Sequence, residues 1–352
     1  MQPGIKQLSD FGTTPDGQTV QRWQLDNGRG LIMEVLNLGG IVTRLSVPDR
    51  HGQSVNICLA PADVATIFRP GWPYLGALIG RVANRVANAQ FTLNGQTYRL
   101  AVNNPPHSLH GGRIGYDRRF WEVTPFHSPE GPAIRLTLTD LDGTEQYPGT
   151  VHVEVTYTLT ILGTWRITYS ATTDQITPIN LTQHAYFNLK DGGRSPITDH
   201  LLQMPCTHYT PTDASLIPTG EICPVAGSAH DFTQPKPLGR DFNRLESDPV
   251  GYDCNYVIPG PSGTLRWAAS VTEPVSGRSM QVYTTQPGVQ LYTGNFLDGS
   301  LLGIDGFAYQ QHAGFCLETQ HYPDALHHPE FPSILLHPGR PYYHTTEYRF
   351  SV

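Results

Sequence analysis

The sequence predicts an all-β protein built from antiparallel strands. Residues 151–161 alternate apolar and polar side chains, which is the period of two expected of a strand with one buried face. Residues 133–139, 165–171 and 342–350 repeat this alternation, and β-branched and aromatic side chains fill these segments. The chain also contains 35 glycines and 30 prolines, a composition that favours many turns and few long helices.

Two short helices and one hairpin are predicted among the strands. Pro61 favours a helix start, so we expect a short helix over residues 62–68. A second short helix is expected near residues 323–328. The Asn94-Gly95 pair stands between two short strand-like segments and predicts a tight hairpin turn.

Residues 205–245 are rich in proline and irregular in pattern. They predict a long covering or functional loop and not a domain boundary. No serine- or proline-rich linker divides the chain, so we expect a single domain over residues 1–352. Its architecture is expected to be many antiparallel strands in stacked sheets.

Charge and composition exclude several classes of protein. The net charge of −7 gives no reason to expect nucleic acid or an anionic membrane as a partner. No segment reaches the ~18 apolar residues of a membrane-spanning helix, and the N-terminus does not read as a signal peptide. The five cysteines include no CxxC pair, which gives no support to a disulfide framework. We therefore expect a cytoplasmic protein that binds a neutral small molecule.

Two histidines and one glutamate are the candidates for proton transfer. His110 lies in a polar turn before two glycines, which would let backbone and ligand come close, and His184 lies in an apolar, strand-like segment. Glu318 lies in an apolar strand-like run, where burial would raise the pKa of its carboxyl and improve it as a base. The residues alone leave structural alternatives open: a turn histidine without a role, a hydrogen-bonded core histidine and a buried ion pair.

Four polar residues are candidates for binding a polyhydroxylated ligand. An arginine donates hydrogen bonds and an aspartate accepts them, so the two together can hold vicinal hydroxyl groups. Each could equally take part in a surface contact. The candidates are Asn84, Arg85, Asp253 and Gln290.

Two spacings match metal-binding motifs only weakly. His107 and His110 form an HxxH pair in a turn, but no third ligand follows at a suitable spacing. Glu318 and His321 form an ExxH pair, which needs a helix to place both side chains on one face, whereas this run is typical of a strand. We therefore expect neither a metal ion nor a cofactor.

Seven short motifs follow one another in a fixed order. They are GRVANR (80–85), LHGG (109–112), NLTQHAYFNL (180–189), GYD (251–253), GVQLYTGN (288–295), LETQHYPDA (317–325) and FPSILLHPG (331–339). This order resembles the aldose 1-epimerase family, the galactose mutarotases, from about residue 25 to the C-terminus. The resemblance implies a large β-supersandwich and the interconversion of α- and β-anomers of a free hexose, galactose or glucose.

The resemblance also implies a role for each candidate residue. His184 matches the general acid that protonates the ring oxygen, Glu318 the general base that takes the proton of the anomeric hydroxyl, and His110 a second histidine that hydrogen-bonds the sugar. Turnover at neutral pH would then need a charged His184, which a nearby carboxylate would favour. The residues that match sugar-binding positions are Asn84, Arg85, Asp253 and Gln290. One position departs from the family, because Cys254 follows the aspartate where a histidine is common.

Two other functions remain open at this point. An epimerase acting on a hexose phosphate would need additional Arg or Lys side chains, and apart from Arg81/Arg85 and Arg118/Arg119 these do not cluster beside the motifs. A non-catalytic sugar-binding module on the same scaffold could keep the hydroxyl-binding residues and lose the acid or the base. The presence of both His184 and Glu318 favours the enzyme. Neither the preferred sugar nor the oligomeric state follows from the sequence.

Overall fold

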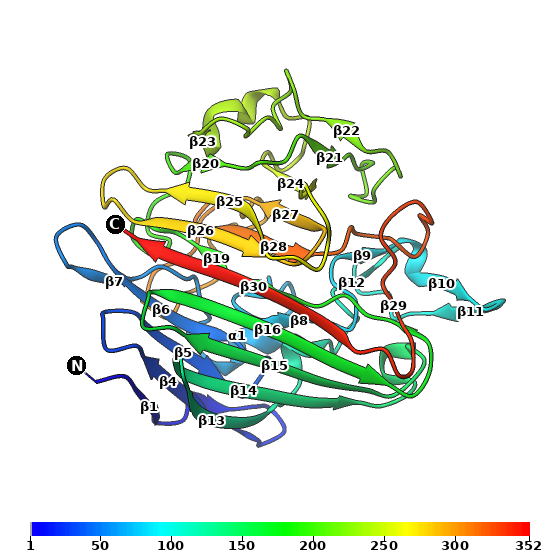
Figure 1. Cartoon of the computed structure of the whole chain (residues 1–352), viewed down its shortest axis with the longest axis horizontal. Helices are drawn as coiled ribbons and strands as arrows, with labels where there is room; N and C mark the ends of the chain where they lie inside the picture. Colours follow the sequence, from blue (N-terminus) through cyan, green and yellow to red (C-terminus); the bar gives the residue numbers. More distant parts are fainter. Residues whose placement is uncertain (1) are drawn as a thin grey trace.

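A computed structural model describes residues 2–352 and confirms the all-β architecture (Figure 1). The largest sheet has nine strands, in the order β13-β14-β15-β16-β30-β26-β25-β20-β23. Its long central strands include the four predicted from alternation, and they pair with their neighbours in antiparallel register. The bounds are β13 (Glu122–Ser128), β14 (Gly131–Asp140), β15 (Val151–Leu159), β16 (Thr164–Thr173), β30 (Tyr342–Ser351), β26 (Ser279–Thr284), β25 (Arg266–Thr272), β20 (Leu201–Gln203) and β23 (Lys236–Pro237).

A six-stranded and a five-stranded sheet complete the main architecture. The six-stranded sheet is built from β19 (Tyr186–Phe187), β28 (Phe315–Gln320), β27 (Gly288–Tyr292), β24 (Asp253–Val257), β21 (His208–Thr210) and β22 (Cys223–Pro224). The five-stranded sheet is built from β1 (Gly4–Gln7), β4 (Arg22–Asp26), β5 (Ile32–Leu36), β6 (Val42–Pro48) and β7 (Ser54–Asn56).

Five two-stranded pairs connect or extend these sheets. They are β2 (Gly12–Thr13) with β3 (Thr19–Val20), β8 (Leu78–Ile79) with β18 (Thr182–Gln183), β9 (Arg85–Val86) with β12 (Ser108–Leu109), β10 (Gln90–Leu93) with β11 (Gln96–Arg99), and β17 (Thr177–Pro178) with β29 (Leu335–Leu336). The β10–β11 hairpin confirms the prediction at Asn94-Gly95. Both turn residues have positive φ, 51° and 81°, as a two-residue hairpin turn of this kind requires.

The apolar faces of the three main sheets meet in one core. One contiguous cluster of buried side chains contains Leu45 from β6, Val155 from β15 and Leu291 from β27. Alternation along β15 places Val151, Val153 and Val155 inside, as the sequence predicts. Because strand side chains alternate between faces, the opposite face of the six-stranded sheet is left free to carry polar groups.

One of the two predicted helices is present. The helix α1 (Val64–Phe68) begins after Asp63, whose carboxylate accepts a hydrogen bond from the Thr66 amide and caps it. The prediction of a helix near 323–328 is wrong, since this segment is a turn. Asp324 there has a φ of 54°, which a right-handed helix does not accommodate. The 3-10 helices are η1 (Ala87–Ala89), η2 (Tyr116–Arg118), η3 (Thr144–Gln146) and η4 (Leu238–Arg244).

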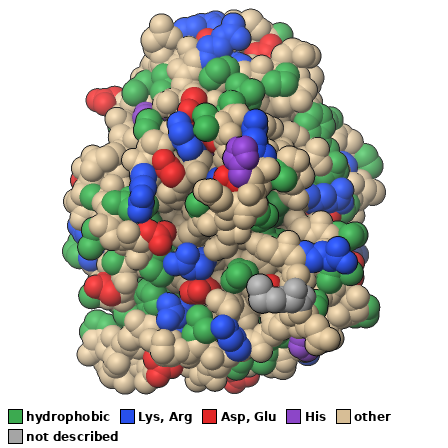
Figure 2. Space-filling view, turned by 90° about the vertical axis from the view of Figure 1, so that its left-hand side faces the viewer, with side chains coloured by type: hydrophobic (Ala, Val, Ile, Leu, Met, Phe, Trp, Pro, Cys, Tyr) green, Lys and Arg blue, Asp and Glu red, His purple; other side chains and the backbone are tan. Residues whose placement is uncertain are grey.

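Residues 205–245 are more ordered than the loop we predicted. They contain β21, β22, β23 and η4, and form much of the upper part of the molecule in Figure 1. Figure 2 shows one face of the molecule, on which acidic and basic side chains are interspersed. None of the helices within residues 2–352 has the length and hydropathy needed to span a lipid bilayer.

Candidate active site

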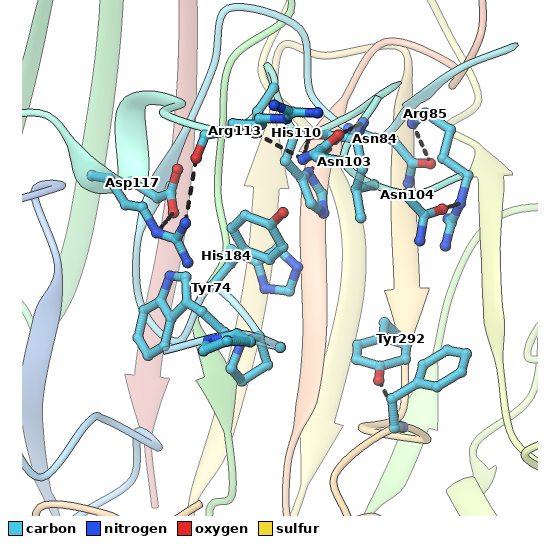
Figure 3. A pocket seen from close by; sticks show the side chains of 18 of the residues that line it. Tyr74, Asn84, Arg85, Asn103, Asn104, His110, Arg113, Asp117, His184 and Tyr292 are labelled. Carbon is cyan, nitrogen blue, oxygen red and sulfur yellow. Dashed lines mark hydrogen bonds and ion pairs between the residues drawn. The ribbon is translucent and has the colours of Figure 1, made fainter. Parts of the chain in front are cut away.

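A pocket of about 610 Å³ contains most of the predicted site residues. Figure 3 shows Asn84, Arg85, His110 and His184 around it, with Tyr74 close to the two histidines. The predicted residues that line the pocket are Asn84, Arg85, His110, His184, Asp253 and Glu318. They come from segments far apart in the chain, so only the fold brings them together.

The six-stranded sheet supplies the two predicted acidic residues of the pocket, Asp253 and Glu318. Glu318 in β28 lies opposite Gln290 in β27, and Asp253 starts β24 on the far side of β27. The neighbouring Leu291 and Leu317 point the other way, into the core. Gln290 itself is not part of the pocket lining; its Nε2 donates to Oδ1 of Asp253 at 2.6 Å. The contact that the structure gives Gln290 is therefore one that orients the Asp253 carboxylate.

A reciprocal backbone contact fixes His110. The His110 amide donates to the Asn84 carbonyl at 3.0 Å, and the Asn84 amide donates to Nδ1 of His110 at 3.1 Å. Both residues have left-handed backbones, with φ of 61° for Asn84 and 51° for His110. Because Nδ1 accepts a hydrogen bond, the neutral His110 ring carries its proton on Nε2. His110 is thus held as a hydrogen-bond donor, and its burial lowers its pKa well below the usual value.

The two glycines after His110 are required by packing within the protein. A Cβ on Gly111 would lie 2.0 Å from the Gly80 carbonyl oxygen, and one on Gly112 would lie 2.2 Å from a carboxylate oxygen of Glu145. Both glycines also have positive φ, 91° and 115°. We expected these glycines to admit a ligand, but the close neighbours are the protein's own atoms, although Gly112 also lines the pocket.

The His184 ring is held between two tyrosines. Tyr74 stacks on it with ring centroids 5.9 Å apart, and Tyr186 stacks on it at 5.1 Å. The His110 ring meets it nearly at a right angle, at a centroid distance of 5.1 Å. His184 is 4% exposed and lies between the short strands β18 and β19. Its ring therefore has a fixed orientation toward the pocket.

The reacting atoms of the predicted acid and base face each other. Nε2 of His184 lies 3.6 Å from Oε2 of Glu318, and this oxygen has no hydrogen-bond partner among residues 2–352. Burial lowers the pKa of His184 to about 4. Burial also raises the pKa of Glu318 well above its usual value, and the neighbouring Asp253 adds to this shift while Arg85 opposes it. Burial thus shifts the pKa values of both groups toward their uncharged forms, which is the direction opposite to that of the charged His184 we expected.

Comparison with known proteins decides the family. The family model for aldose 1-epimerase matches residues 21–349. The chain belongs to the aldose 1-epimerase family. It is 44% identical to the galactose mutarotase of Homo sapiens over 343 residues, which cover 97% of both chains. It is 34% identical to the aldose 1-epimerase of Escherichia coli K12, with 96% of both chains covered.

Solved structures of the aldose 1-epimerase family share this fold. A GalM/aldose epimerase homologue from C. elegans superposes with a TM-score of 0.85 at 27% identity, covering 99% of each chain. Galactose 1-epimerase from Lactobacillus acidophilus superposes with a TM-score of 0.84 at 25% identity, again over 99% of each chain. The family resemblance and the β-sandwich fold expected from it are confirmed, and the protein is an enzyme that interconverts sugar anomers.

The fold of this epimerase also creates a set of possible metal ligands that the sequence patterns did not suggest. One ligating atom from each of His110, His184 and Glu318 lies within 4.8 Å of the others. Two histidines and a carboxylate can hold a transition metal. Each of the two motifs considered from sequence contributes one residue to this set, His110 or Glu318. Their second members do not belong to it, since Nδ1 of His107 accepts from the Asn88 amide and His321 lies outside the pocket. A metal ion here would engage the two side chains for which proton transfer is predicted, His184 and Glu318.

Several residues of the pocket were not predicted. Asn104 accepts from Nε of Arg85 at 3.0 Å, and Asn103 bonds the backbone of Leu109 and Gly112 and so holds the loop that carries His110. Asp117 lies on the other side of the pocket, where burial raises its pKa to about 7. Two neighbouring asparagines at 103–104 were the available signal, whereas nothing local distinguished Tyr74 or Asp117.

Proposed function

We propose that this protein interconverts the α- and β-anomers of free hexoses such as galactose and glucose, with Glu318 as base and His184 as acid. The observation that carries the proposal is the approach of Nε2 of His184 to Oε2 of Glu318, at 3.6 Å within the pocket. The relatives named galactose mutarotase support the choice of sugar. The additional hydroxyl-binding groups would be Asn84, Arg85 and Asp253.

The reaction needs two simultaneous proton transfers. His184 gives its Nε2 proton to the ring oxygen as the bond between that oxygen and C1 breaks. Glu318 takes the proton of the C1 hydroxyl as the C1 carbonyl forms, so the products are an open-chain aldehyde and an uncharged pair. Rotation about the C1–C2 bond presents the other face of the aldehyde, and the reverse transfers close the ring. The pair holds one proton before opening and one after it.

Burial of the His184–Glu318 pair assists the ring-opening step. Ring opening converts a charged imidazolium and carboxylate into a neutral imidazole and carboxylic acid. A buried site disfavours charged groups, and burial shifts the pKa values of His184 and Glu318 in the directions that favour the neutral pair. The pocket therefore stabilises the state reached on ring opening. His110 adds a neutral donor beside the reacting atoms, because its Nε2 carries the proton.

Two basic residues of the pocket, Arg69 and Arg118, are engaged within the protein, which favours a free hexose over a hexose phosphate. The guanidinium of Arg118 donates to the carbonyls of Ile67, Arg113 and Arg69, and that of Arg69 donates to the Ser300 carbonyl. These donors are already used, so they do not form a ready site for a phosphate dianion. Arg85 and Arg113 also line the pocket, and Arg85, whose charge opposes the rise that burial causes in the pKa of Asp253, can meet a hydroxyl group.

Polarimetry on freshly dissolved α-D-galactose and α-D-glucose tests the proposal. We expect the approach to the equilibrium rotation to accelerate in proportion to enzyme concentration. Galactose 6-phosphate serves as the comparison substrate and should give a much lower kcat/KM. An optical rotation that changes no faster than in buffer would overturn the proposal. A higher kcat/KM for galactose 6-phosphate would show that the substrate is a hexose phosphate and not a free hexose.

We also propose that the protein is cytoplasmic and has no nucleic-acid partner. All five cysteines are free, and four of them are buried, which suits a reducing compartment. The net charge of −7 gives no reason to expect nucleic acid as a partner. Fractionation of the source cells, followed by immunoblotting, tests the location; recovery only outside the cytoplasm would contradict it.

A further inference from the structure

The second ring nitrogen of His184 faces a buried thiol. Nδ1 of His184 lies 3.6 Å from Sγ of Cys316. Cys316 lies in β28 two residues before Glu318, so both side chains point to the same face of the six-stranded sheet. It is a free cysteine with no exposed surface. The same strand thus contacts both nitrogens of the His184 ring, through Cys316 at Nδ1 and through Glu318 at Nε2.

The chemistry of this thiol differs from that of a carboxylate partner. Burial raises the pKa of the Cys316 thiol well above its usual value, so the group remains protonated and uncharged. A thiol sulfur is a weak hydrogen-bond acceptor, and a neutral imidazole carries its single proton on whichever nitrogen is paired with an acceptor. An uncharged acceptor can hold the Nδ1 proton without locking the ring in its charged form. The ring then remains free to alternate between neutral and charged states.

We propose that Cys316 is a positioning residue whose sulfur accepts the Nδ1–H of His184 and holds the neutral ring in the Nδ1–H tautomer. Nε2 is then the nitrogen that gains and loses the proton, opposite Oε2 of Glu318. The adjacent His110 has the opposite arrangement, because its Nδ1 accepts from the Asn84 amide. The two histidines are therefore fixed as different tautomers: His184 as a proton carrier and His110 as a hydrogen-bond donor.

This assignment explains how two histidines 5.1 Å apart can have different roles. A neutral His110 cannot take a proton on Nδ1 without losing the hydrogen bond from the backbone amide. A neutral His184 in the Nδ1–H form has a free lone pair at Nε2, directed toward Glu318. The kinetic part of the inference rests on the proposed proton transfers, whereas the tautomer assignment concerns the free protein and does not depend on them.

Nitrogen NMR of the histidine side chains tests the tautomers directly. The measurement uses full-length protein labelled with ¹⁵N in histidine, without sugar and at neutral pH, and His184→Asn and His110→Asn variants assign the two rings. We expect His184 to show a protonated Nδ1 and an unprotonated Nε2, and His110 to show the reverse. An Nε2–H tautomer for neutral His184 would overturn the proposal, whether or not the protein catalyses mutarotation.

Substitutions of Cys316 test its effect on the reaction. Cys316→Val removes the acceptor at similar size, and we expect kcat to fall at least tenfold while KM changes less than threefold, since a correctly placed acid contributes ~10²–10⁴ in rate. Cys316→Ser restores an acceptor and should recover kcat to within about threefold of the wild-type value. Cys206→Val is the control, because Cys206 is also buried but bonds to neither active-site histidine.

The Cys316 variants and the NMR spectra test the role of Cys316 independently. The positioning role would be overturned if Cys316→Val kept the wild-type kcat, or if the kcat of Cys316→Ser were no higher than that of Cys316→Val. If Cys316→Val fails to fold, the wild-type spectrum and the serine variant still decide. If the wild-type enzyme shows no mutarotation, the proposed function fails while the tautomer assignment is judged by its spectra alone.

Discussion

Replacement of Glu318 by glutamine tests the base most sharply. The amide keeps the shape of the side chain in β28 but cannot take the proton of the anomeric hydroxyl. The groups expected to bind the sugar, Asn84, Arg85 and Asp253, remain in place around the pocket. We therefore expect Glu318→Gln to remove catalysis and to leave sugar binding measurable.

The size of the effect follows from the geometry of the pair. Oε2 of Glu318 lies 3.6 Å from Nε2 of His184 and has no hydrogen-bond partner in the described chain. No neighbouring group bonded to this oxygen could therefore take over its role as base. A positioned base contributes ~10²–10⁴ in rate, which corresponds to about 3–5 kcal/mol of transition-state stabilisation. The melting temperature should not fall, because an amide costs less to bury than an ionisable carboxyl.

Polarimetry gives kcat, and calorimetric titration with D-galactose gives the dissociation constant. The matched control is Glu34→Gln, a buried glutamate in β5 that lies outside the pocket, and its kcat should equal the wild-type value. A Glu318→Gln enzyme that keeps more than about a tenth of wild-type kcat would show that Glu318 is not the base. Loss of galactose binding together with kcat would instead indicate a role in binding.

Three further predictions follow from the buried charges. We expect kcat/KM to be bell-shaped in pH, because the His184–Glu318 pair works only when it holds one proton. As pH falls toward the His184 pKa of about 4, the pair gains a second proton and loses its base. As pH rises above the raised pKa of Glu318, the pair loses its single proton and with it the acid. A wild-type profile with no alkaline limb would contradict this. Chelation with EDTA should leave kcat unchanged, because a metal on His110, His184 and Glu318 would block proton transfer; loss of activity restored by a divalent ion would contradict it. Arg81→Met should lower the free energy of unfolding by about 3–5 kcal/mol, since it leaves Asp140 with Arg119 alone as a cationic partner, and denaturant titration showing a loss below about 1 kcal/mol would refute it.

Local patterns in the sequence predicted the strands well. Alternation along residues 151–161 specifies β15 because one of its faces is buried against the core, and the hairpin at Asn94-Gly95 depends only on the conformations those two residues favour. The helix expected near residues 323–328 failed for a non-local reason. The carboxylate of Asp324 accepts a hydrogen bond from the Ala87 amide, 237 residues away, and this contact belongs to a turn.

The sequence predicted six residues that the structure places in one pocket, but not the electrostatics of that pocket. The motif order predicted six residues that line the pocket. The stacking of Tyr74 on His184 was not predictable, because Tyr74 has a left-handed backbone that the neighbouring sequence does not indicate. The protonation of His184 and Glu318 depends on how deeply both are buried, which only the assembled sheets determine. The contact between Cys316 and His184 likewise requires β28 and the segment between β18 and β19 to be placed together.

Exchange between the α- and β-anomers of D-galactose at equilibrium, followed by NMR exchange spectroscopy, tests the central claim most directly. The claim is that protons move only between the sugar oxygens and the His184–Glu318 pair while the hydrogen on C1 stays in place. With galactose deuterated at C1, we predict an exchange rate proportional to enzyme concentration and full retention of the deuterium. An exchange rate equal to that in buffer, or loss of the C1 deuterium to solvent, would contradict the account.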